Sequence, residues 1–143
     1  MTAVYVVIGS QAHHFSNPAF ARTFEFAKLD EVVPTGAVIG SGESPGGGGD
    51  IWAHAWSDSR MHPFKVFDPT KPPYNAYSIP KCFHVRNQAM VDWAKSNAGQ
   101  VLAFWAGNTV HSGTLSTINR AKRAGVPYRV WKIGLNSGTE VFL

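Results

Sequence analysis

The sequence predicts an α/β fold with a mostly parallel central sheet, and three features lead to this prediction. Short apolar runs rich in β-branched and aromatic residues recur along the chain, and segments with helical periodicity separate them. The runs lack a polar alternation, which is typical of strands buried on both faces. The length of 143 residues is that of one domain. Strands that alternate with helices form βαβ units with right-handed crossovers, so we expect a single Rossmann-like three-layer sandwich over residues 1–143.

The apolar runs are the predicted strands. They are Val4–Ile8, Ala37–Ile39, Phe64–Phe67, Val101–Trp105 and Tyr128–Ile133, with Thr139–Phe142 as a short edge strand. Ligands of such sheets bind beyond the carboxyl ends of the strands, so we expect the site in the loops that follow these runs. The Pro-rich segment 68–80 is long for a connection, and we expect it to cover the pocket or to join a partner subunit.

Four helices are predicted between the strands. Asn17 and Pro18 offer an N-cap followed by proline at the first helical position, and Asp50 is a candidate cap for a short second helix. The third helix is predicted to end near Asn97–Gly99, and Gly125 closes the fourth. The apolar stripes, which we expect to be core, are Phe20, Phe24 and Ala27; Trp52, Ala55 and Trp56; Val85, Ala89, Met90, Trp93 and Ala94; and Thr114, Ile118 and Ala121.

Composition and cysteine content narrow the class of protein. With 44% hydrophobic, 13% aromatic and 15% charged residues, the chain is predicted to be globular. No apolar run reaches the ~18 residues that a membrane span needs, and residues 1–8 are predicted to be a strand rather than a signal peptide. Cys82 is the single cysteine, which excludes an internal disulfide and predicts a reducing compartment, the cytoplasm.

The net charge of +4 is unevenly distributed along the chain. Residues 1–71 hold five Lys and Arg against seven Asp and Glu, whereas residues 72–143 hold eight against two. A basic C-terminal half suits an anionic ligand. A nucleic-acid patch is the alternative interpretation, and its candidate residues are Arg120, Lys122, Arg123, Arg129 and Lys132. Solvated charges explain these residues better, because no zinc-finger spacing or aromatic RNA-binding motif accompanies them.

Glycine-rich loops follow the first two predicted strands. The first strand ends in Gly9 and Ser10, and the second runs into a loop that contains Gly42 and Gly49 and ends at Asp50. Glycine lets backbone N–H groups approach an anion closely, and a helix N-terminus adds favourable partial charge. The loop is neither a Walker A motif nor a dinucleotide-binding GxGxxG motif. A phosphate cradle and a flexible connector are both open, and Asp50 is expected to cap the helix, to bind a ribose hydroxyl, or both.

The fourth predicted strand leads into a second glycine-bearing loop at a helix start. The candidate phosphate-binding residues in this loop are Gly107, Ser112, Gly113 and Thr114. Arg86 and Asn87 are predicted to open the third helix, where an arginine fork binds phosphate oxygens bidentately. The alternative for Arg86 is a surface salt bridge. Two such loops at the strand ends of one sheet support a ligand site better than either loop alone.

Several histidines and the cysteine lie near these loops. The histidines that are candidates to touch a ligand are His13, His14, His84 and His111. None has the spacing from Cys, Asp or Glu partners that a metal site needs, so no metal is predicted. Cys82 lies close to His84 in the sequence, but this does not establish a nucleophile pair. We interpret Cys82 as an inert thiol.

Two segments resemble motifs of the SLOG superfamily, which contains the YspA-like branch and the Lonely Guy cytokinin-activating enzymes. Phe83–Met90 is similar to the arginine motif, in the RNxxM form of the YspA-like branch. Val101–Gly107, followed by residues 112–114, is similar to the second motif of the same branch. Gly40–Asp50 matches the earlier glycine-rich loop with a longer insertion. The resemblance spans roughly residues 4–133.

This resemblance implies a Rossmann-like nucleotide-binding fold, whose members sense nucleotide-derived ligands or cleave N-glycosidic bonds of nucleotides. The catalytic branch has a glutamate three residues after its Gly-Thr pair, and Thr117 stands there in this chain. Threonine cannot act as the carboxylate that stabilises an oxocarbenium-like centre or activates water. We therefore expect a protein that binds a nucleotide or nucleotide-derived phosphate ligand, with no cofactor, rather than an enzyme.

The alternative function is a nucleotide or nucleoside N-glycosidic-bond hydrolase. In that case Asp50 or Glu43 would be the catalytic carboxylate and Arg86 would hold the phosphate. The resemblance also implies a homo-oligomer. Trp52 and Trp56 are candidates for the contact between subunits, and core packing explains them equally well.

Overall fold

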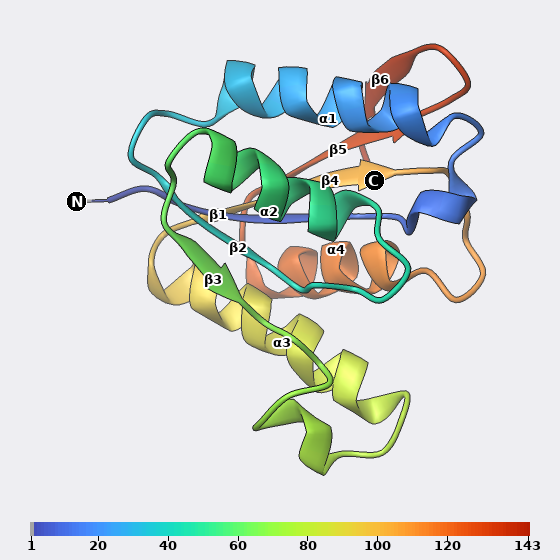
Figure 1. The fold of residues 1–143 in the computed structure, drawn as a ribbon. Coiled ribbons are helices and arrows are strands. Elements are labelled where there is room, and N and C mark those ends of the chain that lie inside the picture. The colour runs from blue at the N-terminus through green and yellow to red at the C-terminus, as the bar shows by residue number, and fades with distance from the viewer. Residues whose placement is uncertain (1) are drawn as a thin grey trace.

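A six-stranded sheet lies at the centre of the computed structural model, which describes residues 2–143 (Figure 1). The strands are β1 (Val4–Gly9), β2 (Val38–Ser41), β3 (Phe64–Val66), β4 (Gln100–Trp105), β5 (Tyr128–Ile133) and β6 (Gly138–Val141). The helices are α1 (Pro18–Val32), α2 (Gly49–Ser59), α3 (Lys81–Ser96) and α4 (Gly113–Ala124), with the short 3-10 turns η1 (Ala12–His14) and η2 (Tyr74–Ala76). Every predicted strand is present, with ends shifted by one or two residues at most.

The strand order is β3-β2-β1-β4-β5-β6, which makes β1 and β4 neighbours. All pairs are parallel except β5 with β6, which are antiparallel. The predicted α/β class and mostly parallel sheet are therefore confirmed, and the order is that of a Rossmann-like fold. The chain builds outward from β1 to β3 on one side and then from β4 to β6 on the other. The winding reverses between β1 and β4, which is where sheets of this kind bind ligands.

Two layers of helices cover the sheet, with α1 and α2 on one face and α3 and α4 on the other. Alternate residues of β1 serve the two cores. Tyr5 and Val7 pack with α1 and α2, whereas Val6 and Ile8 pack with α3 and α4. Because both faces of the strand are buried, its sequence is apolar without a break, as the parallel-sheet prediction requires.

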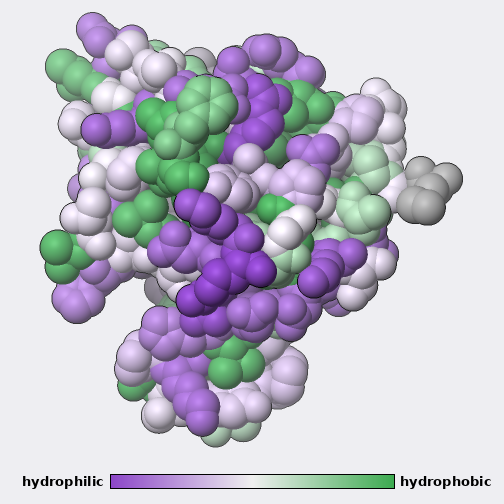
Figure 2. Space-filling view, turned by 180° about the vertical axis from the view of Figure 1, so that it is seen from behind, coloured by the Kyte–Doolittle hydropathy of each residue, from purple (hydrophilic) through white to green (hydrophobic). Residues whose placement is uncertain are grey.

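The segment between β3 and α3 projects from the body of the molecule. Figure 1 shows η2 and the start of α3 at the bottom, beyond the edge of the sheet, and Figure 2 shows the same segment as a lobe. We call residues 68–80 of this segment the arm. Ile79, at the end of the arm, is 79% exposed. The arm therefore presents an apolar side chain at the surface just before α3 begins.

Helix α1 begins as predicted but buries a different row of side chains. The Asn17 side chain accepts a hydrogen bond from the Phe20 backbone N–H at 3.2 Å, and proline occupies the first helical position. The buried row is Ala21, Glu25 and Leu29. The predicted stripe of Phe20, Phe24 and Ala27 is therefore not the inward face: the two aromatic rings pack at the margin of the core and Ala27 is exposed. The spacing of the aromatic residues dominates the sequence pattern, so the prediction missed Ala21 and Glu25, which are the buried positions.

Two predicted helix starts are wrong. Helix α2 begins at Gly49, and its N-cap is Gly48. The backbone of Gly48 has a φ of 95°, a conformation that favours glycine at this position. Asp50 is therefore not the cap, and its carboxylate accepts a hydrogen bond from the backbone N–H of Gly9 instead. Helix α3 begins at Lys81, so Arg86 lies in its second turn and does not open it.

The tryptophans of α2 belong to the interior of the protein. Trp56 is buried, and its indole N–H donates a hydrogen bond to Asp30 of α1 at 2.9 Å. Trp52 packs against the same core, with its ring centroid 5.5 Å from that of Phe15. Ala55 is exposed, and Ala53 takes the inward position instead. Core packing therefore accounts for the aromatic pair of α2.

Glu25 is the exceptional residue of the interior. Its carboxyl group is buried between α1 and the sheet, and neither oxygen has a hydrogen-bond partner within residues 2–143. Burial raises the pKa of Glu25 well above its ordinary value, the nearby carboxylate of Asp50 raises it further, and Arg22 opposes the shift. A buried carboxyl without a partner is stable only in its neutral form, so Glu25 carries a proton in the folded protein.

We predict that Glu25→Gln stabilises the protein increasingly as the pH rises. The unfolded chain releases the Glu25 proton above a pH of about 4.3, whereas the folded chain keeps it to a higher pH. Stability is thus lost as the pH rises from that value to the folded pKa, by about 1.4 kcal/mol for each unit of pKa difference. Urea unfolding at about pH 5 and about pH 8 should give a larger gain for the variant at the higher pH. Equal gains at both pH values, or an equal effect of the control Glu31→Gln at the exposed end of α1, would contradict this prediction.

Candidate functional site

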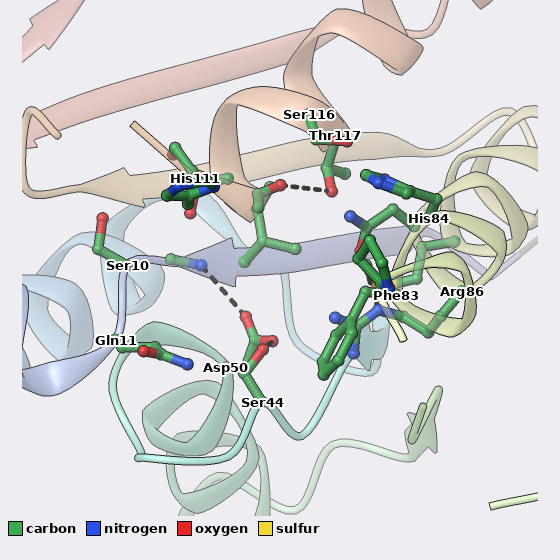
Figure 3. Close-up of a pocket in the computed structure, with 18 of the residues that line it drawn as sticks. Ser10, Gln11, Ser44, Asp50, Phe83, His84, Arg86, His111, Ser116 and Thr117 are labelled. Carbon is green, nitrogen blue, oxygen red and sulfur yellow. Dashed lines mark hydrogen bonds between the residues drawn. The ribbon is translucent and has the colours of Figure 1, made fainter. Parts of the chain in front are cut away.

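A cavity of about 450 Å³ lies beyond the carboxyl ends of β1 and β4, where the winding of the sheet reverses (Figure 3). Its walls come from the loop after β1, the start of α2, the end of the arm, α3 and the N-terminus of α4. Of the ligand-binding residues predicted from the sequence, those that line the cavity are Gly9, Ser10, Asp50, Arg86, Asn87, Ser112, Gly113 and Thr114. Residues far apart in the sequence thus meet at the edge of the sheet, as the fold requires.

Arg86 is a buried cation in the wall of the cavity. Its side chain is only 4% exposed, so the alternative of a surface salt bridge is wrong. The guanidinium donates hydrogen bonds from Nε to Asn87 Oδ1 at 2.9 Å, and from Nη1 to the carbonyl oxygens of Gly42 and Phe67. Its Nη2 has no hydrogen-bond partner within residues 2–143. The protein thus engages Nε and Nη1, and the N–H groups of Nη2 are the ones left for a ligand.

Burial lowers the pKa of Arg86, and the carboxylates of Asp50 and Asp68 oppose this shift. Arginine stays protonated in proteins, so the site keeps a positive charge of low solvation. A buried charge whose hydrogen bonds are incomplete gains much from an anionic partner. Arg86 therefore favours a negatively charged ligand group beside α3.

Asp50 is the carboxylate of the cavity, and the protein already engages both of its oxygens. Oδ1 accepts a hydrogen bond from the Gly9 backbone N–H at 3.2 Å, and Oδ2 accepts one from Ser44 Oγ at 2.6 Å. Burial raises the pKa of Asp50, while Arg86 and the hydrogen bonds from Ser44 and Gly9 act in the opposite direction. This carboxylate holds the start of α2 against the end of β1.

The N-terminus of α4 forms the opposite wall. Ser112 is its N-cap and accepts a hydrogen bond from the Leu115 backbone N–H at 3.2 Å. Gly113 and the buried Thr114 follow in the first turn, where backbone N–H groups have no partner inside the helix. The partial positive charge of this helix end attracts anions. Together with Arg86, α4 gives the cavity two separate donor groups for an anion.

Ser10 joins the loops that follow β1 and β4. Its hydroxyl donates a hydrogen bond to Asn108 Oδ1 at 3.2 Å and accepts one from the Ala106 backbone N–H at 2.9 Å. Next to it, Gln11 Nε2 donates to the carbonyl oxygen of Pro45 at 2.8 Å. The loops after β1, β2 and β4 are therefore tied together around the cavity mouth.

Three glycines that were predicted to bind ligand lie outside the cavity lining: Gly42, Gly49 and Gly107. At Gly42 and Gly49 the chain needs glycine because a side chain would not fit. A Cβ on Gly42 would overlap Arg86 Nη1 and lie 2.9 Å from Asp50 Oδ2. A Cβ on Gly49 would overlap the backbone of Gly9, and one on Gly9 would lie 2.7 Å from the Cα of Gly49. Gly107 has a φ of 92° and lies beside the Lys132 side chain. Gly42 and Gly49 therefore act by allowing close packing and not by lining the cavity.

An apolar wall of the cavity was not predicted residue by residue. It consists of Ile79, Pro80, Phe83 and Met90. Ile79 and Pro80 belong to the Pro-rich segment, which was predicted to cover the pocket or to join a partner subunit. Met90 belongs to the RNxxM segment that the sequence analysis singled out. Polar lining residues that the sequence reasoning missed are Gln11, Ser44, Asn108 and Ser116. Most of these lie inside the predicted loops, where the sequence alone does not show which side chains turn inward.

The remaining candidates divide between the cavity and other places. His14, His84, His111 and Thr117 line the cavity. Glu43 does not, because its carboxylate contacts His54 Nδ1, and the His54 ring stacks on Phe64 with centroids 4.1 Å apart. Cys82 is a buried free thiol. In the described part of the chain, no three His, Cys, Asp or Glu side chains are grouped so that they could hold a metal ion.

Comparison of the chain with protein-family models, with curated proteins and with solved structures gave no match. Among the helices of residues 2–143, none is both long and apolar enough to cross a membrane. The geometry of the cavity is thus the basis on which a function can be argued.

We predict that Gly49→Ala destabilises the protein by roughly 1–3 kcal/mol, because the added methyl group would force the start of α2 away from β1. Gly113→Ala is the matched control, since its Cβ would meet no atom within 4 Å and its position is helical. Alanine there should leave stability unchanged or raise it by up to about 1 kcal/mol. Equal midpoints of chemical denaturation for the two variants would show that the Gly9–Gly49 contact is not tight.

Proposed function

We propose that this protein binds a nucleotide or nucleotide-derived phosphate ligand in the cavity beyond the carboxyl ends of β1 and β4, and that it senses or sequesters this ligand. The observation that supports the proposal best is the buried Arg86 guanidinium in the cavity wall, whose Nη2 forms no hydrogen bond within residues 2–143. The first turn of α4 provides a second group of donors for phosphate oxygens. The resemblance of the Arg86 and α4 segments to SLOG motifs agrees with this assignment.

The apolar wall complements these donors. Phe83 lies beside Arg86, with the guanidinium carbon 5.7 Å from the ring centroid, and Met90 and Ile79 extend the wall. An aromatic ring next to a cationic fork suits a ligand that has a flat base at one end and a charged group at the other. A volume of about 450 Å³ falls within the range of small-molecule sites.

Native mass spectrometry of the protein, as purified and after mixing with mononucleotides, NAD, ADP-ribose and cyclic nucleotides, tests the proposal. We expect a retained or added ligand of unchanged mass, with affinity reduced at least about tenfold in Arg86→Lys, because lysine cannot reproduce the fork. Thr114→Val should also weaken binding, since it removes a hydroxyl at the α4 wall.

Arg60→Lys is the matched control for Arg86→Lys, because Arg60 pairs with Asp30 on the outer surface and lies outside the cavity lining. Circular dichroism of each variant separates a loss of binding from a loss of folding. If no member of the panel binds to the folded wild-type protein, the proposal is wrong.

A nucleotide hydrolase is the second candidate function, and one observation favours it: Asp50 is a buried carboxyl on the cavity with a raised pKa. Against it, both Asp50 oxygens already accept hydrogen bonds. Thr117 Oγ1 donates to the carbonyl oxygen of Gly113 at 3.1 Å, so the position of the family's catalytic glutamate holds a local hydrogen bond of α4.

We predict that the wild-type protein leaves every nucleotide of the panel intact. Chromatography of the panel after incubation with the protein measures any free base. Released base would overturn the assignment as a binding protein. Asp50→Asn should then abolish the release while it keeps much of the binding, and unchanged release by that variant would exclude Asp50 as the catalytic carboxylate.

A further inference from the structure

Three imidazoles stand at the rim of the cavity and have no role in holding the fold. They belong to His14 of η1, His84 of α3 and His111 before α4. All three side chains are exposed, and within residues 2–143 none forms a side-chain hydrogen bond or an ion pair. Figure 3 shows His84 and His111 on opposite sides of the first turn of α4. Two imidazoles thus flank the helix end at which we place the ligand's anionic group.

Charged side chains of both signs surround these two imidazoles. Inside the cavity they face Arg86 of α3, His14 of η1 and Asp50 of α2. On its outer side, His84 adjoins an open groove between α3 and α4, whose charged residues are Lys81, Asp92 and Arg120. An anion placed between the two rings favours their protonated form.

We propose that anion binding in this cavity is coupled to protonation of His84 and His111, so that the protein takes up protons when it binds and releases its ligand as the pH rises. The inference rests on the proposed function and adds a regulatory input to it. Histidine is the side chain whose charge ordinarily changes between about pH 5 and about pH 8. In that range each protonated ring adds a charged donor on one side of the α4 N-terminus, and each neutral ring adds none. The affinity thus falls as the pH rises, towards that of a site without these imidazoles, since only the protonated rings strengthen the bound state.

The test compares the wild-type protein with the double variant His84→Asn and His111→Asn. Calorimetry gives the Kd for AMP and for ADP-ribose at about pH 5.5 and about pH 8.5, at one ionic strength. The ratio of variant to wild-type Kd is the readout, because titration of the AMP phosphate itself, near pH 6, is the same in both proteins and cancels. We expect the wild type to bind about tenfold more tightly than the double variant at the lower pH and equally well at the higher pH.

The matched control is His54→Asn, because the His54 imidazole contacts Glu43 outside the cavity. It should bind like the wild type at both pH values. The double variant should fold normally, because both of its histidines are exposed and unpartnered in the described structure.

The same ratio of Kd values at both pH values would overturn the coupling and leave the binding function in place. Binding of neither probe at any pH would overturn the coupling together with the function on which it rests. A pH-dependent ratio that His54→Asn also showed would overturn the assignment to His84 and His111.

Discussion

The backbone contact between Gly9 and Gly49 is the constraint on which the rest of the site depends. It lets the first turn of α2 lie directly against the end of β1, closer than any side chain would permit. Because of this approach, the Gly9 N–H reaches the carboxylate of Asp50, the residue after Gly49. The loop that precedes α2 must then turn sharply, and Gly48 adopts a φ of 95° to make that turn. The position of α2 in the cavity wall therefore depends on two residues without side chains, Gly9 and Gly49.

Charge interactions in the interior connect Asp50 at the cavity with Arg86 and with Glu25 of α1. Arg86 stabilises the ionised form of Asp50, and Asp50 in turn raises the pKa of Glu25. Asp50 thus lies between a cation that lines the cavity and a protonated acid in the α1–α2 layer. The hydrogen bonds from Gly9 and Ser44 keep Asp50 in place as an acceptor.

The sequence predicted the sheet well because strands buried on both faces need uninterrupted apolar runs, and β1, β4 and β5 have them. It located most of the loops around the cavity for the same reason, since the carboxyl ends of parallel strands share one edge. Three-dimensional contacts decided the rest. The glycines of the second loop act by close approach to partners about forty residues away, such as Gly9 for Gly49, and no local pattern shows which backbone will be the partner. The burial of Glu25 could not be predicted either, because glutamate ordinarily lies at the protein surface.

The balance of donors and acceptors around the cavity explains why we favour retention of an anion over its hydrolysis. Several acceptors are already engaged by the protein: both oxygens of Asp50 receive hydrogen bonds, and Asn87 Oδ1 receives one from Arg86. Donors are left over, since Arg86 Nη2 and the backbone N–H groups of Gly113 and Thr114 lack partners in the described structure. A hydrolase needs a carboxylate placed beside the bond that breaks, either to attack it or to activate water. In this cavity the carboxylate is engaged in holding α2 against β1, whereas the free groups are donors of the kind that suits the anion we propose.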